Sequence, residues 1–285
     1  MLPKKLIILG CGYIGTAFAQ VAKANNIAIT AIVRDQQQAD RLHSLNIKVH
    51  INTSPQAIVD LISQHDALLD SIPLEKATSH ATQCDWLPHI KSAIEHMQWV
   101  AYLSSSSVYG DHQGAWVNEE TSCQPTSPRG KERLHAEQAW QKTFENIRIF
   151  RLSGIYGPKR NLLTRLKTGQ YKALCWPHFS NRIHCDDIID ALMASLCKEQ
   201  HASIINLSDD QPLSHHEYVC ELAKIAQLPQ PTLIPAAEAN QHFSESYLDF
   251  FRDNKRICNK ILHQELLPKL TYSSFRDAVP KLLLQ

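Results

Sequence analysis

Short apolar runs rich in β-branched residues alternate with stretches of helical spacing through the first two thirds of the chain. The apolar runs predict seven strands, at residues 6–9, 29–33, 48–51, 67–69, 99–103, 147–152 and 204–207. Helical spacing covers residues 17–24, 56–63, 86–96, 128–144 and 186–196. Because continuous apolar strands need cover on both faces, this alternation predicts an α/β fold with a doubly wound parallel Rossmann sheet of about seven strands.

The pattern changes after about residue 209. Residues 214–226 have the spacing of an amphipathic helix, prolines within 229–235 interrupt regular structure, and a final helix is expected after Ser274. We therefore expect a Rossmann domain over residues 1–170, completed by about 182–208. Most of residues 171–285 are expected to form a small C-terminal substrate-binding lobe.

The composition narrows the class of protein. The 285 residues carry a formal net charge of +1 without a long basic run, so no nucleic-acid surface is predicted. The uncharged stretch at 6–22 could be mistaken for a signal peptide, but it fits a strand, a turn and a helix better. No other segment approaches the ~20 apolar residues of a membrane span. The eight cysteines include no Cys-x-x-Cys pair, which predicts reduced thiols in a cytoplasmic protein and no metal site.

A glycine-rich turn follows the first predicted strand and precedes the first predicted helix. Its sequence is Gly10-Cys11-Gly12-Tyr13-Ile14-Gly15. The first glycine permits a tight turn, the second lets the backbone approach a pyrophosphate, and the third lets the helix pack close to the strand. The helix N-terminus adds unpaired N–H groups and the positive end of a dipole. We expect these six residues to bind a dinucleotide, a simple tight turn being the alternative.

The end of the second predicted strand bears on which dinucleotide is bound. Proteins selective for NAD usually carry an acidic residue there, which accepts hydrogen bonds from the ribose hydroxyls. Here the aligned position is Val33, and Arg34 follows with a guanidinium suited to the extra 2′-phosphate of NADP. NADP is therefore the expected cofactor. The neighbouring Asp35 leaves NAD open, and a solvated surface arginine is the alternative for Arg34.

Four further motifs, in order along the chain, resemble those of one superfamily. They are Leu-Ser-Ser-Ser-Ser-Val-Tyr-Gly at 103–110, Arg-Leu-Ser-Gly-Ile-Tyr-Gly-Pro at 151–158, Asn-Arg-Ile-His-Cys-Asp-Asp at 181–187 and Ile-Asn-Leu-Ser-Asp at 205–209. With the glycine turn, they make nearly the whole chain similar to the extended, epimerase/dehydratase-like branch of the short-chain dehydrogenase/reductase superfamily. The resemblance implies a cofactor across the carboxyl edge of the sheet and a substrate between the two lobes.

The resemblance breaks at the residues that carry the superfamily's chemistry. A serine, a tyrosine and a lysine four residues after the tyrosine normally act together, the lysine lowering the pKa of the phenol. Here the serine position is Ser105, but the tyrosine and lysine positions hold Arg129 and Arg133. Because an arginine stays protonated at physiological pH, Arg129 cannot be the proton donor. The chain thus resembles an atypical subgroup that lacks the tyrosine.

Three interpretations of this departure remain open. The protein runs altered redox or epimerase chemistry with another acid or base, or it binds the dinucleotide without turnover, or Arg129 and Arg133 clamp an anionic substrate. Ser105 is a further catalytic candidate, against the alternative of a strand-end serine, and Tyr156 is another because it follows a strand's carboxyl end. We expect Ser71, Pro73 and Ser104 beside the cofactor, and Ser106, Tyr109 and Arg182 beside the substrate.

The sequence therefore predicts an NAD(P)-binding oxidoreductase, epimerase or dehydratase that acts on a small polar substrate. A nucleotide sugar is one candidate for that substrate. The alternative is a catalytically silent protein that senses the NADPH/NADP ratio. A homodimer is the assembly that the resemblance suggests, although no interface can be identified from the sequence.

Overall fold

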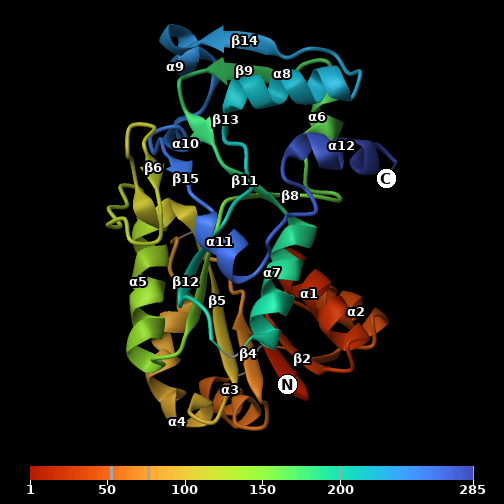
Figure 1. Ribbon diagram of the computed structural model, residues 1–285, viewed down its shortest axis with the longest axis vertical. Helices are drawn as coiled ribbons and strands as arrows, with labels where there is room; N and C mark the ends of the chain where they lie inside the picture. The colour runs from red at the N-terminus through yellow and green to blue at the C-terminus, as the bar shows by residue number, and fades with distance from the viewer. Residues whose placement is uncertain (52–53, 76–77, 199, 285) are drawn as a thin grey trace.

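Seven strands form one central sheet in the computed structural model, which describes residues 1–51, 54–75, 78–198 and 200–284 (Figure 1). In their order across the sheet they are β12 (Ile204–Leu207), β7 (Arg148–Leu152), β5 (Trp99–Ser105), β4 (Ala67–Asp70), β1 (Lys5–Leu9), β2 (Ala28–Val33) and β3 (Lys48–Ile51). Every neighbouring pair is parallel. The order runs outward from β1 in both directions, which confirms the doubly wound Rossmann sheet.

The two faces of this sheet bury separate hydrophobic clusters. Side chains alternate along β1, so that Leu6 and Ile8 belong to one cluster and Ile7 and Leu9 to the other. The first face is covered by α1 (Tyr13–Ala24), α2 (Gln36–Ser44), α7 (Cys185–Cys197) and α11 (Lys260–Glu265), and the second by α3 (Pro55–Ile62), α4 (Lys91–Ile94) and α5 (Pro128–Thr143) (Figure 1). Burying one leucine or isoleucine stabilises the folded state by about 1.5–3 kcal/mol. The helices on both faces therefore hold the sheet firmly, and with it the loops at its carboxyl edge.

Two segments differ from the sequence prediction. No single helix forms over residues 86–96, where the chain instead makes the 3₁₀ helix η2 (Leu87–His89) before α4. Another 3₁₀ helix, η1 (Thr82–Asp85), lies just ahead of this segment. Pro88 explains the break, because proline lacks an N–H and clashes with the preceding helical turn. Helix α2 is absent from the prediction because it is polar and buries only Ala39 and Leu42. It begins at Asp35, whose carboxylate accepts the N–H of Gln38 at 2.8 Å.

A smaller group of elements lies beyond the carboxyl edge of the sheet (Figure 1). The helices predicted at 214–226 and after Ser274 are present as α8 (His215–Ile225) and α12 (Phe275–Leu283), and each begins at a serine with a capping box. They pack with α6 (Leu163–Leu166) and β9 (Lys172–Cys175) around a separate core. Among the described residues, no helix is both long and apolar enough to span a bilayer.

Short elements complete the structure. Strand β8 (Gly154–Tyr156) pairs in parallel with β11 (Arg182–His184) between the sheet and the smaller group (Figure 1). The remaining elements are η3 (Ser106–Tyr109), β6 (Trp116–Val117), β10 (Phe179–Ser180), β13 (Leu213–Ser214), β14 (Thr232–Pro235), η4 (Ala236–Glu238), α9 (Ala239–His242), α10 (Glu245–Asp249) and β15 (Arg256–Ile257). Strands β14 and β9 pair in parallel, as do β15 and β6.

Candidate functional site

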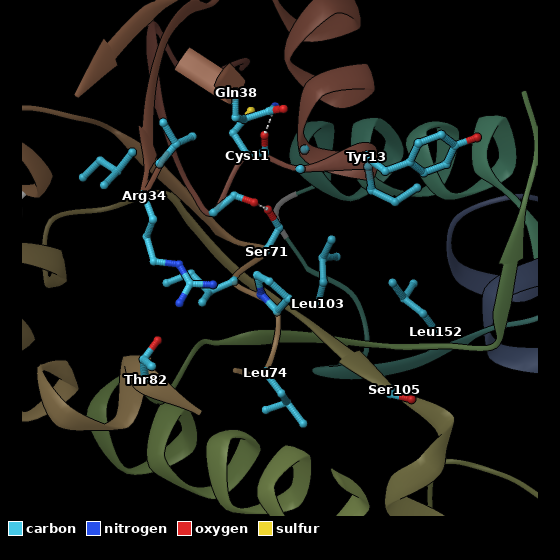
Figure 2. A pocket seen from close by; sticks show the side chains of 18 of the residues that line it. Cys11, Tyr13, Arg34, Gln38, Ser71, Leu74, Thr82, Leu103, Ser105 and Leu152 are labelled. Atoms are coloured by element: carbon cyan, nitrogen blue, oxygen red, sulfur yellow. Dashed lines mark hydrogen bonds between the residues drawn. The ribbon is translucent and has the colours of Figure 1, made fainter. Parts of the chain in front are cut away.

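A large cavity lies at the carboxyl edge of the sheet, where the strand order reverses between β1 and β4. Its volume is about 1270 Å³, and Figure 2 shows side chains from several strand ends converging on it. The lining comes from the segments that follow β1, β2, β4, β5 and β7 and from the first turns of α1 and α5. Doubly wound sheets bind ligands at this switch point. We refer to this cavity as the cleft.

The glycine turn borders the cleft, and two of its glycines are required by the packing. Gly10 has a φ of +71°, and a Cβ there would lie 2.6 Å from Cα of Ile72. A Cβ on Gly15 would lie 2.9 Å from Oγ of Ser71. Both distances are below those that real Cβ atoms show, so neither position accepts a side chain without movement of its neighbours.

Gly12 has a different role, because it is the N-cap of α1 and carries no side chain that could cap the helix. The first backbone hydrogen bond of the helix runs from the N–H of Thr16 to the carbonyl of Gly12, at 2.8 Å. The N–H groups of Tyr13, Ile14 and Gly15 precede this bond and therefore have no acceptor inside the helix. They lie at the positive end of a twelve-residue helix that borders the cleft, which favours an anion at this point.

Side chains from other elements hold the turn in place (Figure 2). The carbonyl of Cys11 accepts hydrogen bonds from Nε2 of Gln38 at 2.6 Å and from the hydroxyl of Thr16 at 3.3 Å. The hydroxyl of Ser71 lies 3.0 Å from the carbonyl of Gly10, to which it can donate. The thiol of Cys11 is buried, which raises its pKa to about 12 and keeps it protonated. The turn is thus preorganised by α2 and by the end of β4.

Two arginines border the cleft near the end of β2. Arg34 is exposed and extends into the cleft toward Thr82 (Figure 2). Arg41 reaches the same cavity from α2, a residue that the sequence analysis missed because α2 itself was not predicted. Within the described residues neither guanidinium forms an ion pair. The acidic neighbour, Asp35, is engaged as the N-cap of α2 through the N–H of Gln38.

The end of β5 places two serines with different partners. Ser105 borders the cleft, and its oxygen accepts the N–H of Ser107 at 3.2 Å (Figure 2). The hydroxyl of Ser104 is buried and donates to the carboxylate of Glu137 at 2.5 Å. That carboxylate also forms a buried ion pair with Arg151 at 2.8 Å. Because Ser104 is held in this buried network, Ser105 is the β5 residue whose hydroxyl is best placed for a ligand.

The first turns of α5 bring Arg129 and Arg133 to the cleft, as the sequence predicts. Arg129 is exposed. The Nη1 of Arg133 donates to the hydroxyl of Tyr102 at 2.8 Å and to the carbonyl of Leu103 at 3.2 Å, so part of its guanidinium ties α5 to β5. Where the resemblance leads us to expect a tyrosine and a lysine, α5 therefore presents two guanidiniums, and neither can donate a proton at physiological pH.

The charge of the cleft lining is strongly unbalanced. Five arginines border it, at positions 34, 41, 129, 133 and 160. The two acids that border it, Asp35 and Asp85, both have partners: Asp35 caps α2, and Asp85 pairs with His80 at 3.0 Å. The cleft therefore favours anionic ligands.

Four predicted site residues do not border the cleft, namely Ser106, Tyr109, Tyr156 and Arg182. The hydroxyl of Tyr109 is buried and donates to Asn206 at 2.8 Å, and the guanidinium of Arg182 lies 3.3 Å from the ring centroid of Tyr218. Tyr156 packs into the core of the smaller group. Burial also raises the pKa of Tyr156, which disfavours its anion. The structure thus turns Tyr109 and Tyr156 into the interior and holds Arg182 against Tyr218, although their motifs border the sheet edge.

One group of residues has donor atoms close enough for a metal ion, among the residues that the structure describes. His184, Cys185 and Asp186 place these atoms within 4.8 Å of one another. Nδ1 of His184, however, accepts the N–H of Asp186 at 3.2 Å and so caps α7. Burial raises the pKa of Cys185 to about 11, which disfavours the thiolate that metals need. These three residues form the N-terminal cap region of α7, and we assign no metal ion to them.

The sheet, the glycine turn and the cleft define a nucleotide-binding fold of the Rossmann class. Residues 4–172 match the model of the family described as RmlD substrate binding domain. This match covers more than half of the chain, so the chain belongs to that family and to the extended short-chain dehydrogenase/reductases. No curated protein matches the sequence.

Solved structures agree with the fold. A functionally unknown conserved protein from Silicibacter pomeroyi DSS is 27% identical, with a TM-score of 0.88 over 99% of this chain and 98% of its own. UDP-N-acetylglucosamine 4-epimerase from Bacillus cereus is 15% identical, with a TM-score of 0.78 over 100% and 99% of the two chains. UDP-glucuronic acid 4-epimerase from the same organism, in complex with NAD, is 18% identical, with a TM-score of 0.75 over 99% of both chains. At these identities the two epimerases share the fold.

Proposed function

We propose that the cleft binds NADP and that the protein is an NADP-dependent oxidoreductase, epimerase or dehydratase acting on a small anionic substrate. The observation that supports this proposal most directly is the cleft itself, in which a glycine turn at a helix N-terminus faces a lining with five arginines. The residues present fit the cofactor. A Cβ on Gly12 would meet only the carbonyl of Gly10, at 3.6 Å, so the backbone is open to a pyrophosphate on its cleft side.

The preference for NADP rests on Arg34 and Arg41. Both border the cleft near the end of β2, where the adenosine ribose of a dinucleotide lies in Rossmann proteins. Two guanidiniums without carboxylate partners suit a 2′-phosphate, whereas the ribose hydroxyls of NAD call for an acid. Asp35, the acidic residue next to Arg34, already accepts the N–H of Gln38 as the N-cap of α2.

The substrate side of the cleft is proposed to be the region of Ser105, Arg129 and Arg160. Arg129 and Arg160 are exposed cations that can hold a phosphate or a carboxylate. The proposed substrate class is a nucleotide sugar, since it carries a diphosphate and since two structural neighbours are named as epimerases of UDP-sugars. The smaller group of elements, mainly within residues 171–285, would complete the substrate site.

When bound, NADP supplies hydride exchange with a carbon of the substrate. Ser105 would hold a substrate carbonyl or hydroxyl through its side-chain oxygen, and Arg129 would orient the substrate's anionic group. Neither arginine of α5 can move a proton. Turnover therefore requires a proton donor other than the superfamily's tyrosine, either from the substrate or from water that reaches Ser105.

Calorimetric titration with NADP, NADPH, NAD and NADH tests the binding proposal. The double change Arg34→Ala with Arg41→Ala should weaken NADP binding roughly 10²-fold or more and leave NAD within about twofold, because each of the two lost charge-assisted hydrogen bonds costs about 1.5–3 kcal/mol. Arg252→Ala, which removes an exposed arginine outside the cleft, is the matched control. Wild-type protein that binds NAD as tightly as NADP would refute the assignment of the two arginines.

A panel of carbonyl compounds and nucleotide sugars tests turnover. Loss of NADPH absorbance or isomerisation of the sugar is expected, and Ser105→Ala should lower kcat by ~10²-fold or more. The second candidate function is a sensor of the NADPH/NADP ratio, which the arginine in place of the tyrosine favours. A sensor would bind NADP and NADPH with different affinities and turn over no member of the panel.

A further inference from the structure

A second cavity, of about 490 Å³, lies in the smaller group of elements and shares no lining residue with the cleft. Its lining comes from residues 165–172, which run from α6 to the start of β9, and from the junction of α9 and α10. Three basic, three aromatic and three polar uncharged side chains form it, without an acidic residue. Its size is in the range of pockets that hold small organic ligands, about 300–1,000 Å³.

The basic side chains of this second cavity lack acidic partners in its lining. The guanidinium of Arg165 lies 4.7 Å from the ring centroid of Tyr171. Nζ of Lys172 lies 3.2 Å from Nδ1 of His242, and Glu238 approaches the other ring nitrogen of His242 at 3.7 Å from outside the lining. Within the described residues, neither Arg165 nor Lys172 forms an ion pair with a carboxylate. Two such cations at one cavity favour an anionic ligand.

The aromatic side chains give the same cavity an apolar wall formed by a stacked pair of rings. The rings of Phe243 and Tyr247 are stacked, with their centroids 4.6 Å apart and an angle of 15° between their planes. The hydroxyls of Tyr171 and Tyr247 both approach Nε2 of the buried His215, at 3.4 and 3.5 Å. Burial lowers the pKa of His215 to about 3, so the imidazole is neutral and can bond to both phenols. One interior group therefore anchors both tyrosines of the cavity.

We propose that the second cavity is a nucleotide-binding site, separate from the dinucleotide cleft. Arg165 and Lys172 would hold the phosphate, and the wall formed by Phe243 and Tyr247 would contact the base. A phosphate ion would need only the cationic side chains, and an apolar ligand would need only the aromatic rings. The combination of both in one cavity matches a molecule with a charged group at one end and a flat ring at the other. This site goes beyond the proposed cofactor function and does not depend on it.

Titration calorimetry of the full chain with UMP, CMP and GMP tests the proposal. At least one should bind, and uridine, cytidine or guanosine and inorganic phosphate should each bind roughly tenfold or more weakly than that nucleotide, since each supplies only half of the contacts. Lys172→Glu should weaken nucleotide binding by at least roughly tenfold. Lys167→Glu reverses the charge of an exposed lysine outside the cavity, and it should leave binding unchanged. Phe243→Leu, a change that keeps both cations, should also weaken binding.

The cleft must be excluded as the place of binding. Gly12→Ala alters the glycine turn and Arg129→Ala the substrate side of the cleft, and neither residue lines the second cavity, so both variants should leave nucleotide binding unchanged. The proposal is overturned if none of the three nucleotides binds at about 10 mM, if the nucleoside binds as tightly as its phosphate, or if Lys172→Glu binds like the wild type. Loss of binding in Gly12→Ala or in Arg129→Ala would place the nucleotide in the cleft and would overturn the proposal as well.

Discussion

The substitution Gly12→Ala distinguishes what the glycine turn contributes to folding stability from what it contributes to pyrophosphate binding. The added Cβ would meet only the carbonyl of Gly10, at 3.6 Å, which is an ordinary van der Waals contact. The φ of Gly12 is −88°, so no left-handed conformation is forced on the alanine, but its ψ of −142° lies outside the α and β regions. The expected costs are up to about 1 kcal/mol for alanine at an N-cap and about 1–3 kcal/mol for this ψ. For a chain of this size each kcal/mol lowers Tm by about 2–4 °C.

The effect on affinity should be far larger. The methyl group would occupy space on the cleft side of the N-terminus of α1, where the N–H groups of Tyr13, Ile14 and Gly15 lack acceptors within the helix. Hydrogen bonds to a charged group contribute about 1.5–3 kcal/mol each, so losing one of them weakens NADP binding roughly 10- to 10²-fold, and losing two roughly 10²-fold or more.

Calorimetry with NADP and a thermal melt without ligand measure the two effects separately. Gly10→Ala is the contrasting variant, because its φ of +71° and the 2.6 Å approach of its Cβ to Ile72 should lower Tm strongly even without ligand. The reasoning fails if Gly12→Ala keeps wild-type affinity for NADP. It also fails if the unliganded Gly12→Ala protein unfolds as early as Gly10→Ala.

Two further predictions concern stability. Glu137→Gln leaves the buried guanidinium of Arg151 without its carboxylate, and it should cost about 3–5 kcal/mol in urea unfolding; an effect below about 1 kcal/mol would contradict the role of this ion pair. Burial raises the pKa of Asp209 from 3.8 to about 8, so the folded protein keeps a proton that the unfolded chain loses. The associated stability is complete below about pH 4 and is lost as the pH rises toward 8, so Asp209→Asn should gain Tm relative to the wild type across that interval. A difference in Tm that stays constant with pH would show that Asp209 does not titrate in this way.

Most of the sheet could be predicted because its signals are local. The apolar runs that become β1, β4 and β12 are buried in the sheet, and the glycine spacing reports on the backbone of one turn. The prediction failed at α2, whose two buried residues are too few to produce a periodic pattern. It failed at residues 86–96 because apolar spacing alone ignored the proline within them.

Part of the candidate site could be predicted because its signals are local too. The glycine turn, Arg34 and Ser105 lie directly at strand ends, and the structure brings all of them to the cleft. Arg41 was missed with the helix that carries it. Tyr156 and Arg182 belong to motifs at the edge of the sheet, yet their side chains pack within the smaller group rather than lining the cleft.

The sequence by itself determined the strands, the glycine turn and the absence of the Tyr-x-x-x-Lys pair, since each depends on residue types at short spacing. Only the tertiary structure decided which polar groups are already engaged. The hydroxyl of Ser104 is bound to Glu137, and part of Arg133 is bound to Tyr102. Such partners lie on different elements, and their pairing follows from how helices pack against the sheet. This packing leaves the remaining arginines free to give the cleft its positive charge.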